Sequence, residues 1–382
     1  MGFLMIKRLF LLAVCGLILA SCNKLRIRDF PEENEPFAQP LLTLQNNFQR
    51  NALSAEELAP PLVEEWEESL PSLPSRGFSA SGNYLVFGMT NGYLAALDLE
   101  DGRFLGKKNL GDACPAPPTI YSSVAFQSFE TGKSGLIAYN LQTGVVLWEI
   151  RDQFSTSSPV LVDERLFHQT AAGLVFCLKY QDGTMLWQKY TGHAVRNSLA
   201  YADDTLISAG SDGTVTAIGH RTGSTVWQNV MKGSLFADPV IADSLVYIAD
   251  YAGDLTTIQL KTGKIVARTR LETPLYCGPT VDASYIYIGL SDGRFVAMDK
   301  TSFKIRYTFK GQGPISSPPL VSDAYIYFTT LANHLYILKK SDGKLLQDIE
   351  FDGRARSTPI IKNNILVIAS DAKVAYAYVQ NF

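Results

Sequence analysis

Residues 239–271 read PVIADSLVYIADYAGDLTTIQLKTGKIVARTRL, a stretch in which short apolar runs alternate with turn-forming residues. Pro239–Ala242 and Leu245–Ala249 are rich in residues that favour strands, and Leu255–Leu260 alternates apolar with polar side chains. Short turns separate these runs from one another and from a last run, Lys264–Leu271. Four antiparallel strands joined by tight turns are typical of one blade of a β-propeller.

The same pattern recurs about every 40 residues along most of the chain. Trp148, Trp187 and Trp227 are 39 and 40 residues apart. The turn before the last strand of each repeat ends on Ser302 in one repeat and on glycine in six others: Gly102, Gly144, Gly183, Gly223, Gly263 and Gly343. A period of this length built from strands indicates propeller blades and not a helical solenoid, so these markers predict seven complete blades.

The chain ends with only three strands of an eighth repeat. The three runs that match the first strands of a blade are Thr358–Ile361, Ile365–Ala369 and Lys373–Tyr378. The missing outer strand is predicted in Leu62–Leu70, because Trp66 precedes Trp148 by 82 residues, about two periods. Residues 61–382 are therefore predicted to form an all-β fold, an eight-bladed β-propeller of four-stranded antiparallel blades. An N-terminal strand completes the last blade and closes the ring.

The N-terminus resembles a bacterial lipoprotein export signal. Residues 1–21 contain Lys7 and Arg8 and then an apolar run too short to span a bilayer as a mature helix, so we predict a cleaved signal peptide. The sequence Leu-Ala-Ser-Cys, ending at Cys22, resembles the lipobox, in which the cysteine is acylated and becomes the mature N-terminus. We predict lipidation of Cys22 and a membrane anchor, and Asn23 favours sorting to the outer membrane. The alternative is an ordinary signal peptide with an incidental cysteine.

Residues 22–60 are predicted to be the lipidated N-terminus and a flexible tether. The stretch is rich in Pro and Glu and shows no sustained period of apolar residues. Residues 41–58 allow an alternative, a short helix that binds a partner.

Composition and side-chain chemistry argue against several classes of function. The formal net charge is −3 and no basic stripe occurs, so no nucleic-acid partner is predicted. The four histidines fall in different repeats at no metal-ligand spacing, and no catalytic or haem-attachment motif occurs. No catalytic residue, metal or cofactor is therefore predicted. Acidic residues that precede a glycine in a tight turn, such as Asp182 and Asp292, are interpreted as turn formers. Buried thiols are predicted at Cys114, Cys177 and Cys277.

Two stretches of the repeat resemble a known family of propellers. Residues 253–265, GDLTTIQLKTGKI, and residues 136–148, LIAYNLQTGVVLW, are similar to the repeat of quinoprotein-like (PQQ-type) propellers. Together with the lipobox, the tether and eight minimal blades, they resemble the BamB family of outer-membrane assembly lipoproteins. The resemblance implies a non-enzymatic scaffold of the outer-membrane β-barrel assembly machinery, lipid-anchored in the outer membrane with its propeller facing the periplasm.

Two other functions fit the same fold. One is a periplasmic or surface lipoprotein propeller that binds another protein or a glycan. The other is a PQQ-dependent dehydrogenase, which is disfavoured because the blades lack long insertions and the chain has no adjacent cysteine pair.

The resemblance also implies where a partner binds. Family members dock onto the periplasmic domains of the barrel subunit (BamA-like) through loops on one face, including a leucine-rich turn that ends in arginine between the third and fourth blades. Val195 and Arg196 match that turn, and His193 replaces an apolar residue. In the next such loop, Asp238 is one carboxylate in place of an acidic pair. These four residues are the predicted partner-binding residues, with a solvated loop cation as the alternative for Arg196. Unfolded outer-membrane proteins are a further predicted partner, held at blade edges by β-augmentation.

Overall fold

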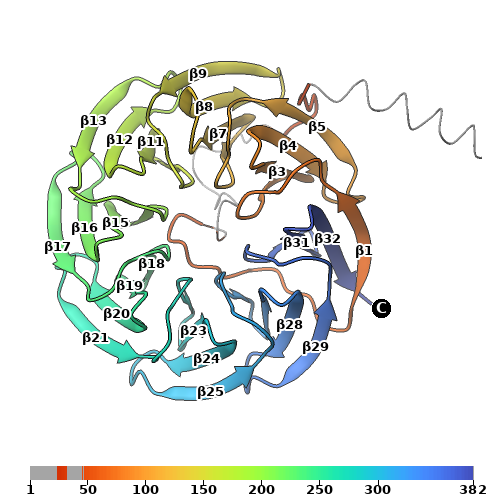
Figure 1. Cartoon of the computed structure of the whole chain (residues 1–382), viewed down its shortest axis with the longest axis vertical. Coiled ribbons are helices and arrows are strands. Elements are labelled where there is room, and N and C mark those ends of the chain that lie inside the picture. Colours follow the sequence, from red (N-terminus) through yellow and green to blue (C-terminus); the bar gives the residue numbers. More distant parts are fainter. Residues whose placement is uncertain (1–23, 32–44, 46, 382) are drawn as a thin grey trace, which may run out of the picture.

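The chain folds into a ring of eight blades around a central axis. The computed structural model describes residues 24–31, 45 and 47–381, and Figure 1 views the ring along its axis. Each blade is a four-stranded antiparallel sheet, and no α-helix occurs among these residues. The predicted all-β, eight-bladed propeller is confirmed. In the part of the chain that the structure describes, no helix is long and apolar enough to cross a membrane.

Within a blade the strands follow one another from the axis to the periphery (Figure 1). Blade 1 consists of β2 (Ser79–Ser81), β3 (Tyr84–Gly88), β4 (Tyr93–Asp98) and β5 (Phe104–Asn109). Blade 2 consists of β6 (Thr119–Tyr121), β7 (Val124–Ser128), β8 (Ser134–Asn140) and β9 (Val145–Arg151). Blade 3 consists of β10 (Val160–Val162), β11 (Arg165–Gln169), β12 (Leu174–Lys179) and β13 (Met185–Tyr190). Blade 4 consists of β14 (Ala200–Ala202), β15 (Thr205–Ala209), β16 (Thr214–Gly219) and β17 (Thr225–Val230).

The second half of the ring repeats this order. Blade 5 consists of β18 (Val240–Ala242), β19 (Leu245–Ala249), β20 (Asp254–Gln259) and β21 (Ile265–Arg270). Blade 6 consists of β22 (Thr280–Val281), β23 (Tyr285–Gly289), β24 (Arg294–Asp299) and β25 (Ile305–Lys310). Blade 7 consists of β26 (Leu320–Val321), β27 (Tyr325–Thr329), β28 (His334–Lys339) and β29 (Leu345–Glu350). Blade 8 consists of β30 (Ile360–Lys362), β31 (Ile365–Ser370), β32 (Val374–Gln380) and β1 (Leu62–Ser69).

Burial explains the sequence pattern of a blade. In blade 5, β19 and β20 are buried along almost their whole length, whereas exposed and half-buried residues make up β21. The middle strands lie between neighbouring blades, so both of their faces are covered and both carry apolar or small residues. The last strand borders solvent, which is why only part of its residues are apolar.

The two ends of the chain close the ring. β1 pairs with β32 in an antiparallel register that runs from Leu62 opposite Gln380 to Ser69 opposite Val374. In Figure 1, β1 lies outside β32 at the periphery of blade 8. This pairing covers an edge of β32 that would otherwise be open to other chains, and it confirms the predicted role of the N-terminal strand.

Each tryptophan packs on the turn glycine of the next blade. A Cβ atom at Gly102 would come within 2.6 Å of the Trp66 indole, whose Nε1 donates a hydrogen bond to the Leu99 carbonyl oxygen at 2.9 Å. The same packing recurs at three more interfaces, formed by Trp148 on Gly183, Trp187 on Gly223 and Trp227 on Gly263. Glycine and tryptophan therefore share one period because they form one contact between blades.

Blade 6 differs from the sequence prediction at this turn. Ser302 was expected at the glycine position, but Phe303 occupies it. Phe303 has a positive φ of 56°, and its amide donates to the Asp299 carbonyl oxygen as the amide of Gly263 does to Gln259 in blade 5. Four residues later, Tyr307 packs on Gly343 and donates its hydroxyl to the Lys340 carbonyl oxygen at 2.6 Å. Tyrosine thus takes the place of tryptophan in this blade.

Two parts of the predicted flexible tether are packed against the propeller. Leu25, Ile27 and Phe30 are buried against blades 1 and 2. Residues 47–60 cross the centre of the ring and continue into β1 (Figure 1). For these residues the expectation of a flexible spacer was wrong, because their apolar side chains and backbone groups find partners on the blades. The rest of the predicted tether, with Cys22 and the signal peptide, lies outside the described residues.

We call Gln45 and residues 47–53 the axial segment. The innermost strands of blades 4, 5 and 7 donate amide hydrogen bonds to its backbone, from Tyr201 to Phe48, from Ile241 to Gln49 and from Val321 to Ala52. Residues 47–58 form turns and an isolated bridge, so the alternative of a helix over residues 41–58 is not met in its described part.

Arg50 occupies the centre of the axial segment and is fully buried. Its guanidinium donates hydrogen bonds to the carbonyl oxygens of Leu199 at 2.9 Å and Ser158 at 3.3 Å. Burial lowers the pKa of Arg50 to about 10, and the nearby negative charge of Asp238 acts in the opposite direction. Arg50 therefore stays charged at neutral pH and joins blades 3, 4 and 5 from inside the ring.

The turn and cysteine predictions agree with the structure. Asp182 and Asp292 each accept a backbone amide hydrogen bond two residues on, from Thr184 and Arg294, as turn-forming residues do. All three cysteines within the described residues are buried and free. Burial raises the pKa of each thiol to about 12.

We expect His168 to make the ring less stable in mild acid. Burial lowers the pKa of this histidine to about 4, although its hydrogen bond to the Gln153 carbonyl oxygen acts in the opposite direction. In the unfolded chain its pKa is about 6.5. The folded state therefore binds fewer protons between these two values, and the free energy of unfolding falls as pH drops from about 6.5 to 4, by roughly 3 kcal/mol in total.

Urea unfolding at pH 7.5, 6.0, 5.0 and 4.5 measures this loss. His168→Gln keeps an amide donor for Gln153 and removes the titrating group, so its stability is expected to depend less on pH. An equal slope in the variant and in the wild type would contradict the prediction.

A candidate docking surface at the mouth of the ring

Eight equivalent loop residues surround the axis on one face of the ring. This loop face carries the connections from the last strand of each blade to the first strand of the next. In each connection one exposed or half-buried residue lies near the axis, and the next residue in the sequence is buried. We call these eight residues the mouth positions: Arg76, Pro115, Thr156, Arg196, Phe236, Tyr276, Ser316 and Arg356. Together they line two hollows of about 630 Å³ and about 50 Å³.

Three mouth positions are arginines. Arg76, Arg196 and Arg356 are exposed and line the larger hollow. None of the three forms a hydrogen bond or ion pair with another described residue, and Glu130 is the one carboxylate among the residues that line this hollow. The mouth therefore carries excess positive charge on guanidinium groups that are free to bind carboxylates in the bidentate manner that arginine favours.

Exposed aromatic side chains lie beside these arginines. Phe236 and Tyr276 are mouth positions, and Tyr251 follows β19 on the same face. The ring of Tyr251 lies 5.7 Å from that of Phe236 and 6.0 Å from that of Tyr276, measured between centroids. Arginine and large aromatic residues dominate the binding energy of protein interfaces, so this combination suits a docking surface.

The structure separates the four predicted partner-binding residues into exposed and buried ones. Arg196 is exposed at the mouth, whereas Val195 is buried and its amide donates to the Ala171 carbonyl oxygen. His193 is also buried, and burial lowers the pKa of its imidazole. Val195 and His193 thus hold the backbone of the loop in place and present Arg196.

Asp238 has both carboxylate oxygens engaged inside the protein. One accepts a hydrogen bond from the Ser198 amide at 2.6 Å and the other from Gln45 Nε2 at 2.9 Å. The side chain is buried beside the smaller hollow and near Arg50. Its position indicates that Asp238 orients the axial segment and the loop before β14. A partner would contact the exposed residues around Asp238 and not its buried carboxylate.

Sequence reasoning did not find Arg76, Arg356, Phe236 or Tyr276. The signal was present, because the mouth positions follow the same period of about 40 residues as the turn glycines. The residue type at this position varies from blade to blade and only the backbone register is constant, so the sequence does not mark these residues as a set.

The chain is similar in sequence to proteins of outer-membrane assembly. A sequence profile of the family described as “Outer membrane protein assembly factor BamB” matches residues 53–205, 211–317 and 252–346. A relative of the same name from Shewanella oneidensis is 32% identical over 119 residues, which are 30% of this chain and 30% of that relative. The aligned region thus spans less than one third of the length of the relative.

Solved structures match the ring as a whole. The structure of BamB from Moraxella catarrhalis has a TM-score of 0.70 at 19% identity, covering 83% of this chain and 99% of that one. A europium-containing methanol dehydrogenase has a TM-score of 0.75 at 12% identity, covering 90% of this chain and 98% of that one. At such identities both likenesses show a shared fold, which hosts an assembly factor in one case and an enzyme in the other.

Proposed function

The chain belongs to the family of the outer membrane protein assembly factor BamB, and on this premise we propose that it is a non-enzymatic scaffold of the outer-membrane β-barrel assembly machinery. The observation that carries the proposal is the mouth of the ring, where free arginines and exposed aromatic residues from separate blades converge. A rigid ring holds these side chains at fixed spacing, so little conformational entropy is lost when a partner docks.

We infer that the partner at the mouth is the barrel subunit of the machinery. The guanidinium groups of Arg76, Arg196 and Arg356 suit an acidic patch on that subunit, and the aromatic rings supply apolar area. The larger hollow, with a volume of about 630 Å³, offers space for side chains of a projecting loop of the partner.

The periphery of the ring offers a second kind of contact. The last strand of each blade lies at one end of its sheet, so its outer edge has no strand partner. The last strands of blades 2 to 7 carry exposed apolar side chains: Val145, Val146, Leu147, Met185, Leu186, Val226, Ile265, Val266, Ile305, Leu345 and Leu346. Unpaired edges with apolar side chains favour transient strand addition, which supports unfolded outer-membrane proteins as further partners.

We propose that lipidation of Cys22 anchors the chain to the periplasmic side of the outer membrane. The lipobox-like sequence ending at Cys22 and the following Asn23 support this location. Radiolabelled palmitate should be incorporated into the wild type and not into Cys22→Ala.

Charge reversal at the mouth is expected to weaken capture of the barrel subunit. In detergent-solubilised membranes, Arg196→Glu should lower recovery about tenfold, and Arg196→Glu with Arg356→Glu should lower it further, because an acidic patch would then be repelled. Neither substitution should lower the melting temperature, since these side chains make no contact that the fold requires. Arg268→Glu, an exposed arginine on β21, changes the charge equally and is the matched control.

Recovery of the barrel subunit at wild-type levels by the folded double variant would place the contact elsewhere on the ring. Failure of the wild type to recover any assembly subunit under mild conditions would contradict the proposed function itself and favour a different protein or a glycan as partner.

A further inference from the structure

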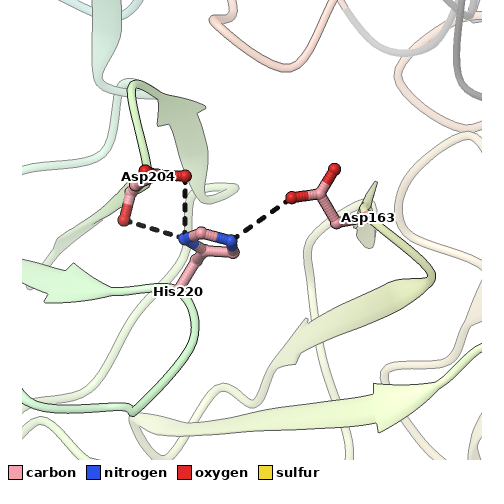
Figure 2. Close-up of side chains that lie close together, drawn as sticks. All are labelled: Asp163, Asp204 and His220. Atoms are coloured by element: carbon pink, nitrogen blue, oxygen red, sulfur yellow. Dashed lines mark hydrogen bonds and ion pairs between the residues drawn. The ribbon is translucent and has the colours of Figure 1, made fainter.

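A histidine and two aspartates meet between blades 3 and 4, on the face opposite the mouth. Asp163 lies in the turn between β10 and β11, Asp204 in the turn between β14 and β15, and His220 follows β16. Arg196 precedes β14 and Asp204 follows it, so the two sites lie at opposite ends of the same strand. Figure 2 shows the imidazole of His220 between the two carboxylates.

The backbone fixes both aspartates. Asp163 and Glu164 have φ values of 47° and 61°, and Asp203 and Asp204 have φ values of 45° and 62°. Two consecutive residues with positive φ are typical of the tight hairpin turn that matches the twist of the strands. The backbone therefore places the two aspartates on either side of the seam between the blades.

His220 is held by its Nδ1 atom and leaves its Nε2 atom without a hydrogen bond. The side chain is 1% exposed, and Nδ1 lies 3.1 Å from the Asp204 carbonyl oxygen, which can only accept a hydrogen bond. Nδ1 therefore carries the proton of the neutral ring, and Nε2 presents a lone pair. This buried lone pair has no hydrogen-bond partner and points at Asp163, whose carboxylate oxygen is 3.6 Å away. Two acceptors that face each other across this gap are both satisfied when a donor or a cation lies between them.

Two other seams of the same ring show what the fold places at this position. Lys300 in blade 6 contacts Asp243 of blade 5 at 2.6 Å, and Lys340 in blade 7 contacts Asp282 of blade 6 at 3.0 Å. Both lysines also donate to a backbone carbonyl of the hairpin turn in their own blade. His220 makes the equivalent pair of contacts in blade 4, but an imidazole, unlike a lysine, does not carry a permanent positive charge.

The distances favour a metal ion as the missing cation. A separation of 3.6 Å between Nε2 and the Asp163 oxygen is too long for a hydrogen bond. With bonds of about 2.1 Å to nitrogen and oxygen, two ligands of one tetrahedral zinc ion lie about 3.4 Å apart. One ligand atom from each of the three residues lies within 4.8 Å of the others.

We propose that His220, Asp163 and Asp204 form a site for a divalent transition-metal ion of the zinc class, which joins blades 3 and 4. His220 Nε2 and the Asp163 carboxylate are the first two ligands. The Asp204 carboxylate lies 3.4 Å from Nδ1, on the other side of the ring, and its side chain is 73% exposed, so it must rotate towards the ion to become the third ligand. Water completes the coordination. The hydrogen bond from Nδ1 to the Asp204 carbonyl fixes the ring orientation, as in many zinc sites.

Arg221 is the competing group at this site. Its guanidinium lies 3.7 Å from the same Asp163 oxygen, and its side chain is 64% exposed. An exposed pair of this kind contributes little, so the arginine can withdraw when the ion binds.

Zinc titration of the tag-free protein by calorimetry tests the site. We expect one ion per chain, and Co²⁺ in its place should give the visible absorption of a tetrahedral nitrogen and oxygen site. His220→Gln and Asp163→Asn should each weaken zinc binding at least about tenfold. Asp243→Asn removes a carboxylate from the equivalent turn of blade 5, where Lys300 supplies the charge, and should leave zinc binding unchanged.

A second measurement distinguishes the metal from a bound proton. Zinc at neutral pH should raise the melting temperature of the wild type and leave that of His220→Lys unchanged, because the lysine supplies its own charge as in blades 6 and 7. If the wild type binds neither zinc nor cobalt, the proposal is overturned, because a proton or a water then fills the gap. Zinc binding that survives His220→Gln would overturn it as well.

Discussion

Trp66→Ala is expected to lower the free energy of unfolding by about 3–5 kcal/mol, the usual range for removing a buried tryptophan. Trp66 is 8% exposed, packs on Gly102 and donates a hydrogen bond to Leu99. It is also the largest apolar side chain of β1, the strand that closes the ring. Loss of this contact weakens the hold of β1 on blade 1, so we expect β1 to detach before the rest of the ring unfolds.

Urea unfolding and hydrogen exchange at the amides of β1 measure this effect. Val63→Ala, at a residue of the same strand that is 40% exposed, is the matched control and should cost less than about 1 kcal/mol. Exposure of the edge of β32 should also make Trp66→Ala self-associate at high concentration. Equal stability of the two variants would show that the closure does not depend on the indole.

The blades could be predicted because their determinants are local and repeated. Alternating apolar runs define the strands, and the contact between a tryptophan and the glycine of the next blade sets a single period for both residues. Trp66 revealed the closure since it belongs to the same series. The error at Ser302 arose where Phe303 adopts the positive φ usually left to glycine, so residue type no longer marked the turn.

The residues at the axis and in the seams could not be predicted, since no local pattern specifies them. The axial segment has a polar composition typical of a tether, and it is ordered because Arg50 and Asn51 satisfy backbone groups of three different blades. Arg76, Arg196 and Arg356 converge through ring geometry alone. His220 meets Asp163 only because neighbouring blades place their turns side by side.

Arg50→Met is expected to cost about 3 kcal/mol of the free energy of unfolding. The methionine fills a similar volume but leaves the carbonyl oxygens of Leu199 and Ser158 without the donors that Arg50 supplies. It also leaves the buried carboxylate of Asp238 without the neighbouring positive charge that favours it. Removing one partner from a buried charged pair typically destabilises a protein by about 3–5 kcal/mol.

Arg26→Met is the matched control for this substitution. Arg26 also donates to a backbone carbonyl, that of Gln142, but at an exposed position, so its loss should cost less than about 1 kcal/mol. Increased proteolysis within residues 47–60 of Arg50→Met would show that the stability is lost in the axial segment and the residues that follow it. Equal unfolding free energies for the two variants would show that the axial segment is held by its other contacts.

A double-mutant cycle separates the charge contribution from the packing contribution at the axis. The buried Asp238 carboxylate is expected to destabilise the fold only when Arg50 is absent. Asp238→Asn should therefore lower the free energy of unfolding more in the wild type than in Arg50→Met. The asparagine side-chain oxygen can still accept from the Ser198 amide, so the hydrogen bond to the loop before β14 is retained in part.

A coupling energy above about 1 kcal/mol would mean that Arg50 and Asp238 act together to position the loop that carries Arg196. Rigidity at the axis would then contribute to docking at the mouth, and Arg50→Met should weaken capture of the barrel subunit although Arg50 is buried. Additive losses with normal capture would confine Arg50 to a role in stability.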